Sequence, residues 1–132
     1  MLNRTHCLIA LMMVAMFALA GCRAGAEIRN VEDAPIAGNP SLAEVRNAII
    51  RAGAERGWRM TPQGDGTILG NLEVRNHVAR VDIRYDRSSY NITYRDSQNL
   101  EHDPAQGTIH KNYNSWVKNL DTDIYNELAL LR

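Results

Sequence analysis

The feature of this sequence that most limits its fold is an alternation of apolar and polar residues, with a period of two, over the segment 77–95. The residues that share the apolar side are Ala79, Val81, Ile83, Tyr85, Tyr90, Ile92 and Tyr94. This period is typical of β-strands that bury one face and expose the other. If the turn 86–89 pairs Tyr85 with Tyr90, every apolar residue of both strands falls on the same side, as a half-buried sheet requires. The segment therefore predicts an antiparallel hairpin.

Two further strands can be added upstream in register. A two-residue turn at 75–76 pairs Ile68 with Ile83 and keeps the apolar residues on the same face. A five-residue connection at 62–66 then pairs Met60 with Ile68, although its proline removes one hydrogen-bond donor. We therefore predict a four-stranded antiparallel meander with one apolar face.

Two helices flank these strands in the sequence. The first, 41–56, begins with Ser41 and Glu44 at the spacing of a capping box and ends before Gly57, a residue that suits a helix C-terminus. The second covers about 110–130. The apolar residues that recur at helical spacing are Leu42, Val45, Ile49 and Ala52 for the first helix, and Ile109, Tyr113, Trp116, Val117, Leu120, Ile124, Leu128 and Leu131 for the second.

Helices with one apolar stripe and a sheet with one apolar face can bury one another. We therefore predict an α+β fold, a two-layer sandwich of order α-β-β-β-β-α in which both helices cover one face of the four-stranded antiparallel meander. Residues 96–108 are expected to form a loop, and residues 41–132 a single domain. The opposite face of the sheet is expected to be exposed to solvent.

The N-terminal residues have the pattern of a secretory signal. A basic residue, Arg4, precedes an apolar run over 7–20, which is shorter than the roughly 18 residues that a membrane-spanning helix needs. The sequence Leu19-Ala20-Gly21-Cys22 that follows resembles the lipobox of bacterial lipoproteins. The resemblance implies a signal peptide over 1–21, cleavage before the cysteine, and acyl chains such as palmitate on that residue. An uncleaved anchor helix and an ordinary secretory cleavage site are the alternatives.

Several acyl chains on one residue hold a protein on a membrane without a spanning helix. In enterobacterial lipoproteins, an aspartate directly after the cysteine favours retention at the inner membrane, and here that position is Arg23. The resemblance therefore implies an anchor in the inner leaflet of the outer membrane, with the folded domain in the periplasm.

Residues 22–40 have the composition of a lipidated N-terminus followed by a flexible tether. They contain glycine, alanine, proline and scattered charges, without a sustained period. A flexible chain of this length spans about 20–25 Å root-mean-square. In the alternative, the short run Ile28–Ile36 docks on the domain as an edge strand.

Composition excludes two kinds of feature. Cys7 lies in the expected signal peptide and Cys22 is the expected lipid attachment residue, so the two cysteines of the sequence leave none for a disulfide in the domain. The 15 basic residues balance the 15 acidic residues. This balance gives no electrostatic basis for binding nucleic acid.

Four stretches of the sequence carry a second resemblance. They are GW at 57–58, ARVDIRY at 79–85, YNITYRDSQNL at 90–100 and IHKNYNSWVKNL at 109–120. Together they resemble a group of small uncharacterised proteobacterial lipoproteins, over about residues 41–125. The resemblance depends on the spacing of the four stretches and implies no activity and no catalytic residue.

The polar residues give no signature of catalysis or of metal binding. The histidines of the mature chain, His77, His102 and His110, lack the spacing of zinc ligands on a helix. Asp121 and Asp123 are two residues apart on a predicted helix and do not face each other as the carboxylates of a glycosidase do. Motifs for a nucleophilic serine are absent from the sequence. We therefore expect no metal, no cofactor and no enzymatic activity.

Two groups of residues are candidate binding sites. On the exposed face of the sheet, Arg80 is expected opposite Arg95, with Arg84 further along the same strand, and opposed like charges favour an anionic ligand or partner. In the alternative, nearby carboxylates offset these charges. At the start of the second helix, His110 and Asn112 lie beside aromatic residues, a combination that suits carbohydrate or peptide recognition.

The sequence alone therefore predicts a lipid-anchored periplasmic lipoprotein whose domain is a non-enzymatic binding or envelope-assembly module. Its expected partner is an envelope protein, and its expected link to the membrane is the lipid on Cys22. A domain that binds a small ligand or peptidoglycan is the alternative, and an unrecognised hydrolase is a third hypothesis.

Overall fold

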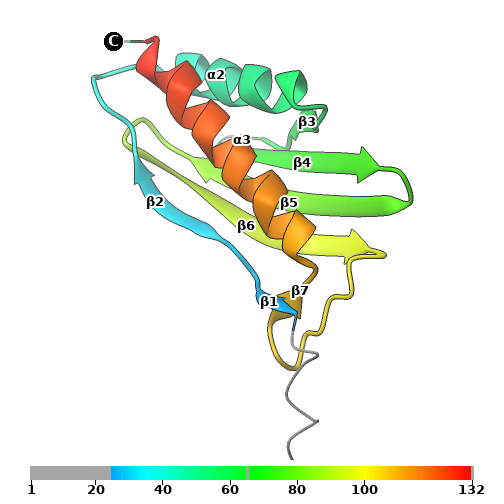
Figure 1. Cartoon of the computed structure of the whole chain (residues 1–132). Helices are drawn as coiled ribbons and strands as arrows, with labels where there is room; N and C mark the ends of the chain where they lie inside the picture. The colour runs from blue at the N-terminus through cyan, green and yellow to red at the C-terminus, as the bar shows by residue number, and fades with distance from the viewer. Residues whose placement is uncertain (1–24, 65, 132) are drawn as a thin grey trace, which may run out of the picture.

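The structure is a computed structural model that describes residues 25–64 and 66–131. Within these residues the chain forms a five-stranded antiparallel sheet, a two-stranded sheet and two helices (Figure 1). The elements are β1 Ala26–Glu27, β2 Val31–Pro35, α2 Leu42–Glu55, β3 Arg59–Pro62, β4 Thr67–Val74, β5 His77–Tyr85, β6 Ser89–Gln98, β7 Thr108–Ile109 and α3 Lys111–Ala129. The predicted α+β class is confirmed. The expected signal peptide and Cys22 lie outside the described residues.

The strands of the large sheet follow the order β2-β6-β5-β4-β3. The three central strands have the register that the sequence predicts, because Ile68 pairs with Ile83 and Tyr85 pairs with Tyr90. The apolar residues that the sequence predicts on one side, such as Ile68, Ile83 and Ile92, therefore share a face.

The strand β3 pairs with β4 two residues away from the predicted register. Pro62, rather than Met60, lies opposite Ile68, and Met60 lies opposite Gly70. Because Gly70 has no side chain, its neighbours fill the space: a Cβ at this position would lie 3.3 Å from the Trp58 ring and 3.5 Å from the Met60 sulfur. A shift of two residues returns each side chain to the same face. The predicted pairing is wrong, whereas the predicted face is kept.

The large sheet has five strands rather than the predicted four, because β2 pairs with β6 and forms an edge. This strand belongs to the run Ile28–Ile36, for which docking as an edge strand was the alternative to a flexible tether over 22–40. Val31 lies opposite Ile92 on the apolar face. The register of β2 shifts between residues 31 and 34, and Asp33 within the shift has a φ of 49°. This bulge interrupts the alternation of apolar and polar residues, so the sequence pattern does not indicate a strand here.

The segment 96–108, expected to be a loop, is partly regular. The strand β6 continues to Gln98, and the two-residue strand β7 precedes α3. In the small sheet, Ala26 of β1 pairs with Ile109 and Glu27 pairs with Thr108. The chain on the N-terminal side of β2 is therefore joined to the start of α3.

The helix α2 begins and ends as the sequence predicts. The Ser41 hydroxyl accepts the Glu44 N–H at 3.1 Å, and the Glu44 carboxylate accepts the Ser41 N–H at 2.7 Å. This reciprocal pair is a capping box. At the other end Gly57 has a φ of 86°, and the Trp58 N–H donates to the Gly53 carbonyl at 2.9 Å, which is the pattern of a Schellman motif.

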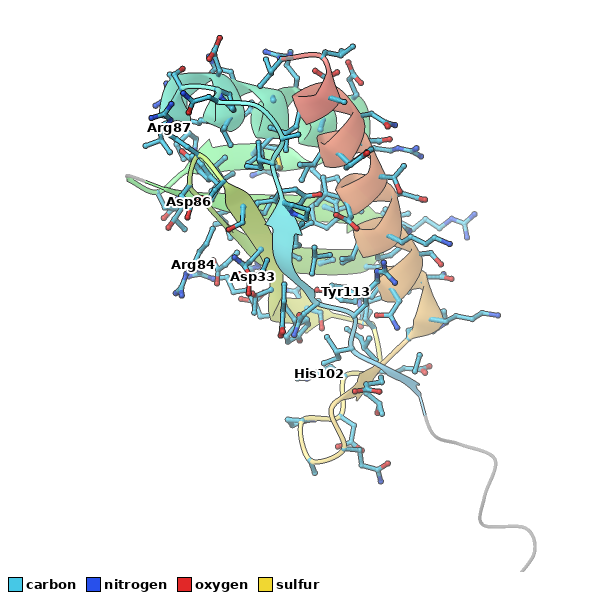
Figure 2. The ribbon with its side chains drawn as sticks, turned by 90° about the vertical axis from the view of Figure 1, so that its left-hand side faces the viewer. Asp33, Arg84, Asp86, Arg87, His102 and Tyr113 are labelled. Carbon is cyan, nitrogen blue, oxygen red and sulfur yellow. The ribbon has the colours of Figure 1, made fainter. Side chains whose placement is uncertain are left out.

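Both helices lie on one side of the large sheet (Figure 1; Figure 2). The helix α3 crosses the strands, and α2 lies next to it. Two ion pairs join the helices: Arg51 to Glu127 at 3.1 Å, and Arg56 to Asp123. The two-layer arrangement, with the helices on a single face, follows the prediction.

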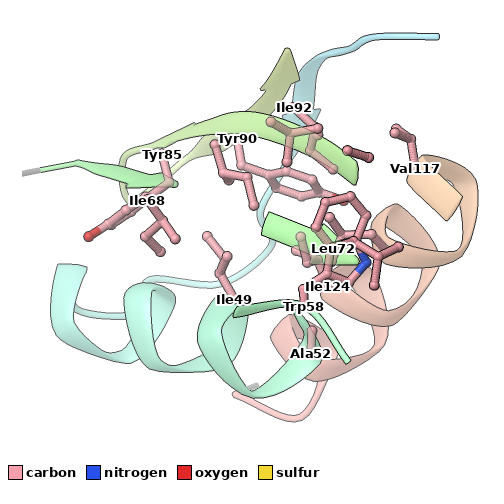
Figure 3. Close-up of a cluster of buried hydrophobic side chains, with 14 of the residues drawn as sticks. Ile49, Ala52, Trp58, Ile68, Leu72, Tyr85, Tyr90, Ile92, Val117 and Ile124 are labelled. Carbon is pink, nitrogen blue, oxygen red and sulfur yellow. The ribbon is translucent and has the colours of Figure 1, made fainter. Parts of the chain in front are cut away.

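The core lies between the sheet and the two helices (Figure 3). Its fully buried large side chains are Tyr90, Tyr113, Ile49, Ile68, Ile83, Ile92, Leu100, Ile109, Leu120, Ile124, Val45 and Val81. They come from both helices, from the central strands, from β7 and from the loop after β6. The burial of these apolar side chains is the main stabilising contribution to the fold.

Candidate functional site

The first candidate site is the side of the large sheet that faces away from the helices, which we call the outer face. It consists of the residues that alternate with core positions along β3 to β6, namely Arg59, Thr61, Thr67, Leu69, Asn71, Glu73, Val78, Arg80, Asp82, Arg84, Asn91, Thr93, Arg95, Asp96 and Gln98. In Figure 2, Arg84 lies on the side of the sheet opposite to the helices. The outer face is therefore a polar surface that the described helices leave uncovered.

The expected pairing of Arg80 with Arg95 is wrong. The register of β5 against β6 shifts between Arg80 and Val81, so that Asp96 lies opposite Arg80. The Arg80 Nε donates to the Asp96 carboxylate at 2.6 Å, and Arg95 donates to Asp82 at 2.9 Å. A bulge with one extra residue on β6 thus replaces two opposed like charges by two ion pairs.

A third ion pair on the outer face joins Arg59 to Glu73 at 3.2 Å, and the Asn71 amide also donates to Glu73 at 3.1 Å. The side chains of the three pairs are between 30% and 71% exposed. Ion pairs of this exposure contribute at most about 1 kcal/mol each, because water screens them. A charged partner can therefore rearrange them at little cost to the fold.

Arg84 differs from the two other arginines that the sequence indicates. Its side chain is exposed, and it takes part in none of the ion pairs between described residues. The residues directly opposite, Thr67 and Asn91, are neutral. The structure therefore places Arg80, Arg84 and Arg95 on one face, where Arg84 alone of the three has no carboxylate partner among the described residues.

The second candidate site lies at the start of α3, and we call it the ring cluster. Its members are His77, Tyr94, His102, His110, Tyr113 and Trp116. The His77 ring centroid lies 6.5 Å from that of His110, with 28° between the planes, and 6.3 Å from that of Trp116. The Tyr94 ring lies 4.7 Å from that of His102 and 5.5 Å from that of Tyr113.

The two residues that the sequence indicates in this region, His110 and Asn112, have a local structural role. The His110 Nδ1 accepts the Asn112 N–H at 3.1 Å and so caps the N-terminus of α3. His77 lies within 2.6 Å of the Asn99 carbonyl oxygen through its Nδ1. Because a carbonyl only accepts, this nitrogen of His77 carries a proton. His77 thereby links the β4–β5 turn to the end of β6.

The hydroxyl of Tyr113 is the unusual group of the ring cluster. The side chain is fully buried, and the hydroxyl has no hydrogen-bond partner among the described residues. Burial raises the pKa of Tyr113 well above its ordinary value. By contrast, the buried Tyr90 donates its hydroxyl to the Asp121 carboxylate at 2.7 Å. A buried polar atom without a partner is costly, and native structures contain few of them.

The carboxylates considered for hydrolysis have other partners. Asp121 accepts the Tyr90 hydroxyl, and Asp123 pairs with Arg56 of α2. The described residues contain no group of three or more His, Cys, Asp or Glu side chains that could hold a metal ion. Both carboxylates are therefore engaged in contacts within the fold.

Two observations complete the description of the chain. Among the described residues, no helix is both long enough and apolar enough to cross a membrane. Comparison of the chain with protein-family models, with curated proteins and with solved structures finds no match in any of the three.

Proposed function

We propose that the chain is a bacterial lipoprotein, anchored through acyl chains on Cys22 to the inner leaflet of the outer membrane, with its α+β domain in the periplasm. The support for the anchor is the sequence Leu19-Ala20-Gly21-Cys22 at the end of a short apolar run, followed by Arg23. The domain acts as a non-enzymatic binding or envelope-assembly module.

The observation that carries this proposal is the outer face. The helices cover one side of the five-stranded sheet and leave the other side open, with Arg84 on it (Figure 2). The other arginine and carboxylate side chains of this face form ion pairs that remain partly exposed. A surface of mixed charge suits a protein partner, because complementary charges orient the two surfaces and select the partner. Arg84 supplies a cation for a carboxylate of that partner, and arginine binds a carboxylate through two parallel hydrogen bonds.

Crosslinking in intact cells, followed by mass spectrometry of the captured proteins, tests the outer face. The informative variant is Arg84→Glu, because it reverses a charge without breaking an ion pair of the described structure. The matched control is Arg46→Glu, which makes the same change at an exposed position of α2. We expect one envelope protein to be captured by the wild type and by the control and to be lost with Arg84→Glu. Equal capture by both variants would contradict a partner on the outer face.

The ring cluster favours a second function, the binding of a small ligand or of peptidoglycan. Aromatic rings beside amide and histidine groups suit a sugar, and the Tyr113 hydroxyl offers a buried donor without a partner among the described residues. This function predicts retention on isolated peptidoglycan that is lost in His102→Ala and kept in Arg84→Glu. The opposite pattern, or no retention, would leave the outer face as the better supported site. A hydrolase is the least supported function, because Asp121 and Asp123 are engaged elsewhere.

A further inference from the structure

The described residues begin at Gly25, three residues after the expected lipid attachment residue in the sequence. The Gly25 backbone lies directly against β7, because a Cβ on this residue would be 3.1 Å from the Ile109 carbonyl oxygen and 3.3 Å from the Ile109 nitrogen. Ladder pairing of β1 with β7 follows at once, and the Ile28 N–H donates to the Gly107 carbonyl at 3.0 Å. The chain is thus held in place from its first described residues onward.

Two residues, Arg23 and Ala24, separate Cys22 from Gly25 in the sequence. Three peptide units span at most about 10 Å, whatever conformation they adopt. This reach is about half of the distance expected for a flexible tether over 22–40. A lipid on Cys22 would therefore hold β1 at the membrane surface.

The residues near β1 form one end of the molecule, which we call the anchor end: β1, β7 and the loop 99–107 (Figure 1). The helix α2 lies at the opposite end. The helix α3 runs from the anchor end toward α2, and its 19 residues have a length of about 28 Å. The two ends of the domain therefore lie at very different distances from any surface that contacts β1.

We propose that the anchor end rests on the phospholipid headgroups of the leaflet that holds the Cys22 acyl chains, and that the domain stands on this end in a fixed orientation. This inference rests on the lipidation of Cys22 in the proposed function. The occupant of the anchor end is the headgroup layer, because the length of chain between the lipid and β1 leaves no room for a protein between them.

The charge of the anchor end indicates how it is held. The exposed residues of its loop include Glu101, His102 and Gln106, and Lys111 follows at the start of α3. These residues form no basic cluster of the kind that binds anionic lipids. The acyl chains, rather than charge attraction, therefore provide the binding energy. The sheet extends from the anchor end toward α2 (Figure 2). The outer face therefore stands upright on the membrane, where it can meet a partner that lies beside the domain.

Fluorescence quenching in vesicles tests this orientation. The wild-type mature chain has no cysteine other than Cys22, and acylation consumes that thiol, so one introduced cysteine can be labelled alone. The matched variants are Ala105→Cys in the loop of the anchor end and Ala54→Cys in α2, both at exposed positions. Each full-length lipidated variant carries a bimane label and is reconstituted in phosphatidylcholine vesicles that contain a lipid with a nitroxide on its headgroup. We expect the label at 105 to lose most of its fluorescence and the label at 54 to keep it.

Two further measurements separate the possible failures. Flotation of the unlabelled wild type with the vesicles tests the lipid anchor, and its absence would contradict the proposed function itself. Flotation combined with equal quenching at 105 and 54 would overturn the fixed orientation while the anchor stands. An insertion of about twelve Gly and Ser residues before Gly25 adds about 19 Å of root-mean-square reach. This variant should still float, and the quenching at 105 should fall.

Discussion

The two faces of the large sheet are made from alternate residues of the same strands, and they are held in different ways. On the inner face, Val81 and Ile83 are fully buried and belong to the apolar core that the sheet shares with the helices. On the outer face, Arg80 and Asp82 are paired with charged residues of β6 and remain partly exposed. Apolar burial contributes several times more free energy per side chain than an exposed ion pair. The inner face therefore determines the fold, and the outer face can change to meet a partner.

The largest difference between the faces is expected at two neighbouring residues of β5. Ile83→Ala should lower the free energy of unfolding by about 3 kcal/mol, because it leaves a cavity in a packed core. Arg84→Ala should change it by less than about 0.5 kcal/mol, because the side chain is exposed. Urea denaturation followed by the fluorescence of the buried Trp58 measures both values. Similar losses for the two variants would show that the two faces do not differ in this way.

Two buried tyrosines of the core, Tyr90 of β6 and Tyr113 of α3, should differ in their contribution to stability. Tyr90→Phe should lower the free energy of unfolding by about 1–2 kcal/mol, because it removes a hydrogen bond to the Asp121 carboxylate. Tyr113→Phe should leave stability unchanged or raise it, because its hydroxyl has no partner among the described residues. The same denaturation measurement compares the pair. A clear loss with Tyr113→Phe would indicate that a bound molecule satisfies this hydroxyl.

The ion pairs of the outer face should have a small effect on stability. A double-mutant cycle with Arg80→Ala and Asp96→Ala should give a coupling energy of about 0.5 kcal/mol at low ionic strength. The coupling should decrease at about 1 M salt, where the screening length is only about 3 Å. A large coupling that does not respond to salt would place this pair among the determinants of the fold.

The turn between β5 and β6 sets the register that assigns residues to the two faces, and its pH response should be the smallest effect. The Asp86 carboxylate accepts the backbone N–H groups of Ser88 and Ser89, which lowers the pKa of Asp86 below its ordinary 3.8. Since the folded pKa lies below the unfolded value, this contribution to stability is present above the ordinary pKa and is lost as the pH falls through the folded value. NMR titration of the carboxyl group measures the midpoint. Asp86→Asn should lose less stability than the wild type between about pH 6 and about pH 3.

The sequence predicts the inner face well, because burial constrains every second residue and short turns fix the register. The register of β3 is missed by two residues because a slip of that size keeps the same residues on the apolar face. The contact of Met60 with Gly70 decides between the two registers, and it depends on the shape of the side chains rather than on their polarity. The sequence indicates the edge strand β2 only as an alternative, because the bulge at Asp33 interrupts the alternation of apolar and polar residues.

The outer face and the ring cluster are harder to predict for a related reason. The bulge that pairs Arg80 with Asp96 involves polar residues, for which neither face carries a burial cost that fixes the register. In the ring cluster, His77 meets His110 and Tyr94 meets His102 only in the folded chain. No periodicity along the sequence indicates that these side chains come into contact.

The two edges of the large sheet have a consequence for copies of this chain at high local concentration. An unpaired strand edge is a template on which another chain can extend the sheet. Here β2 is bent by the bulge at Asp33 and ends in Pro35, whereas β3 has only four residues, begins with Arg59 and ends in Pro62. Such features oppose edge-to-edge growth. If Cys22 carries the proposed lipid, copies confined to a single leaflet would then collide often without polymerising into a continuous sheet.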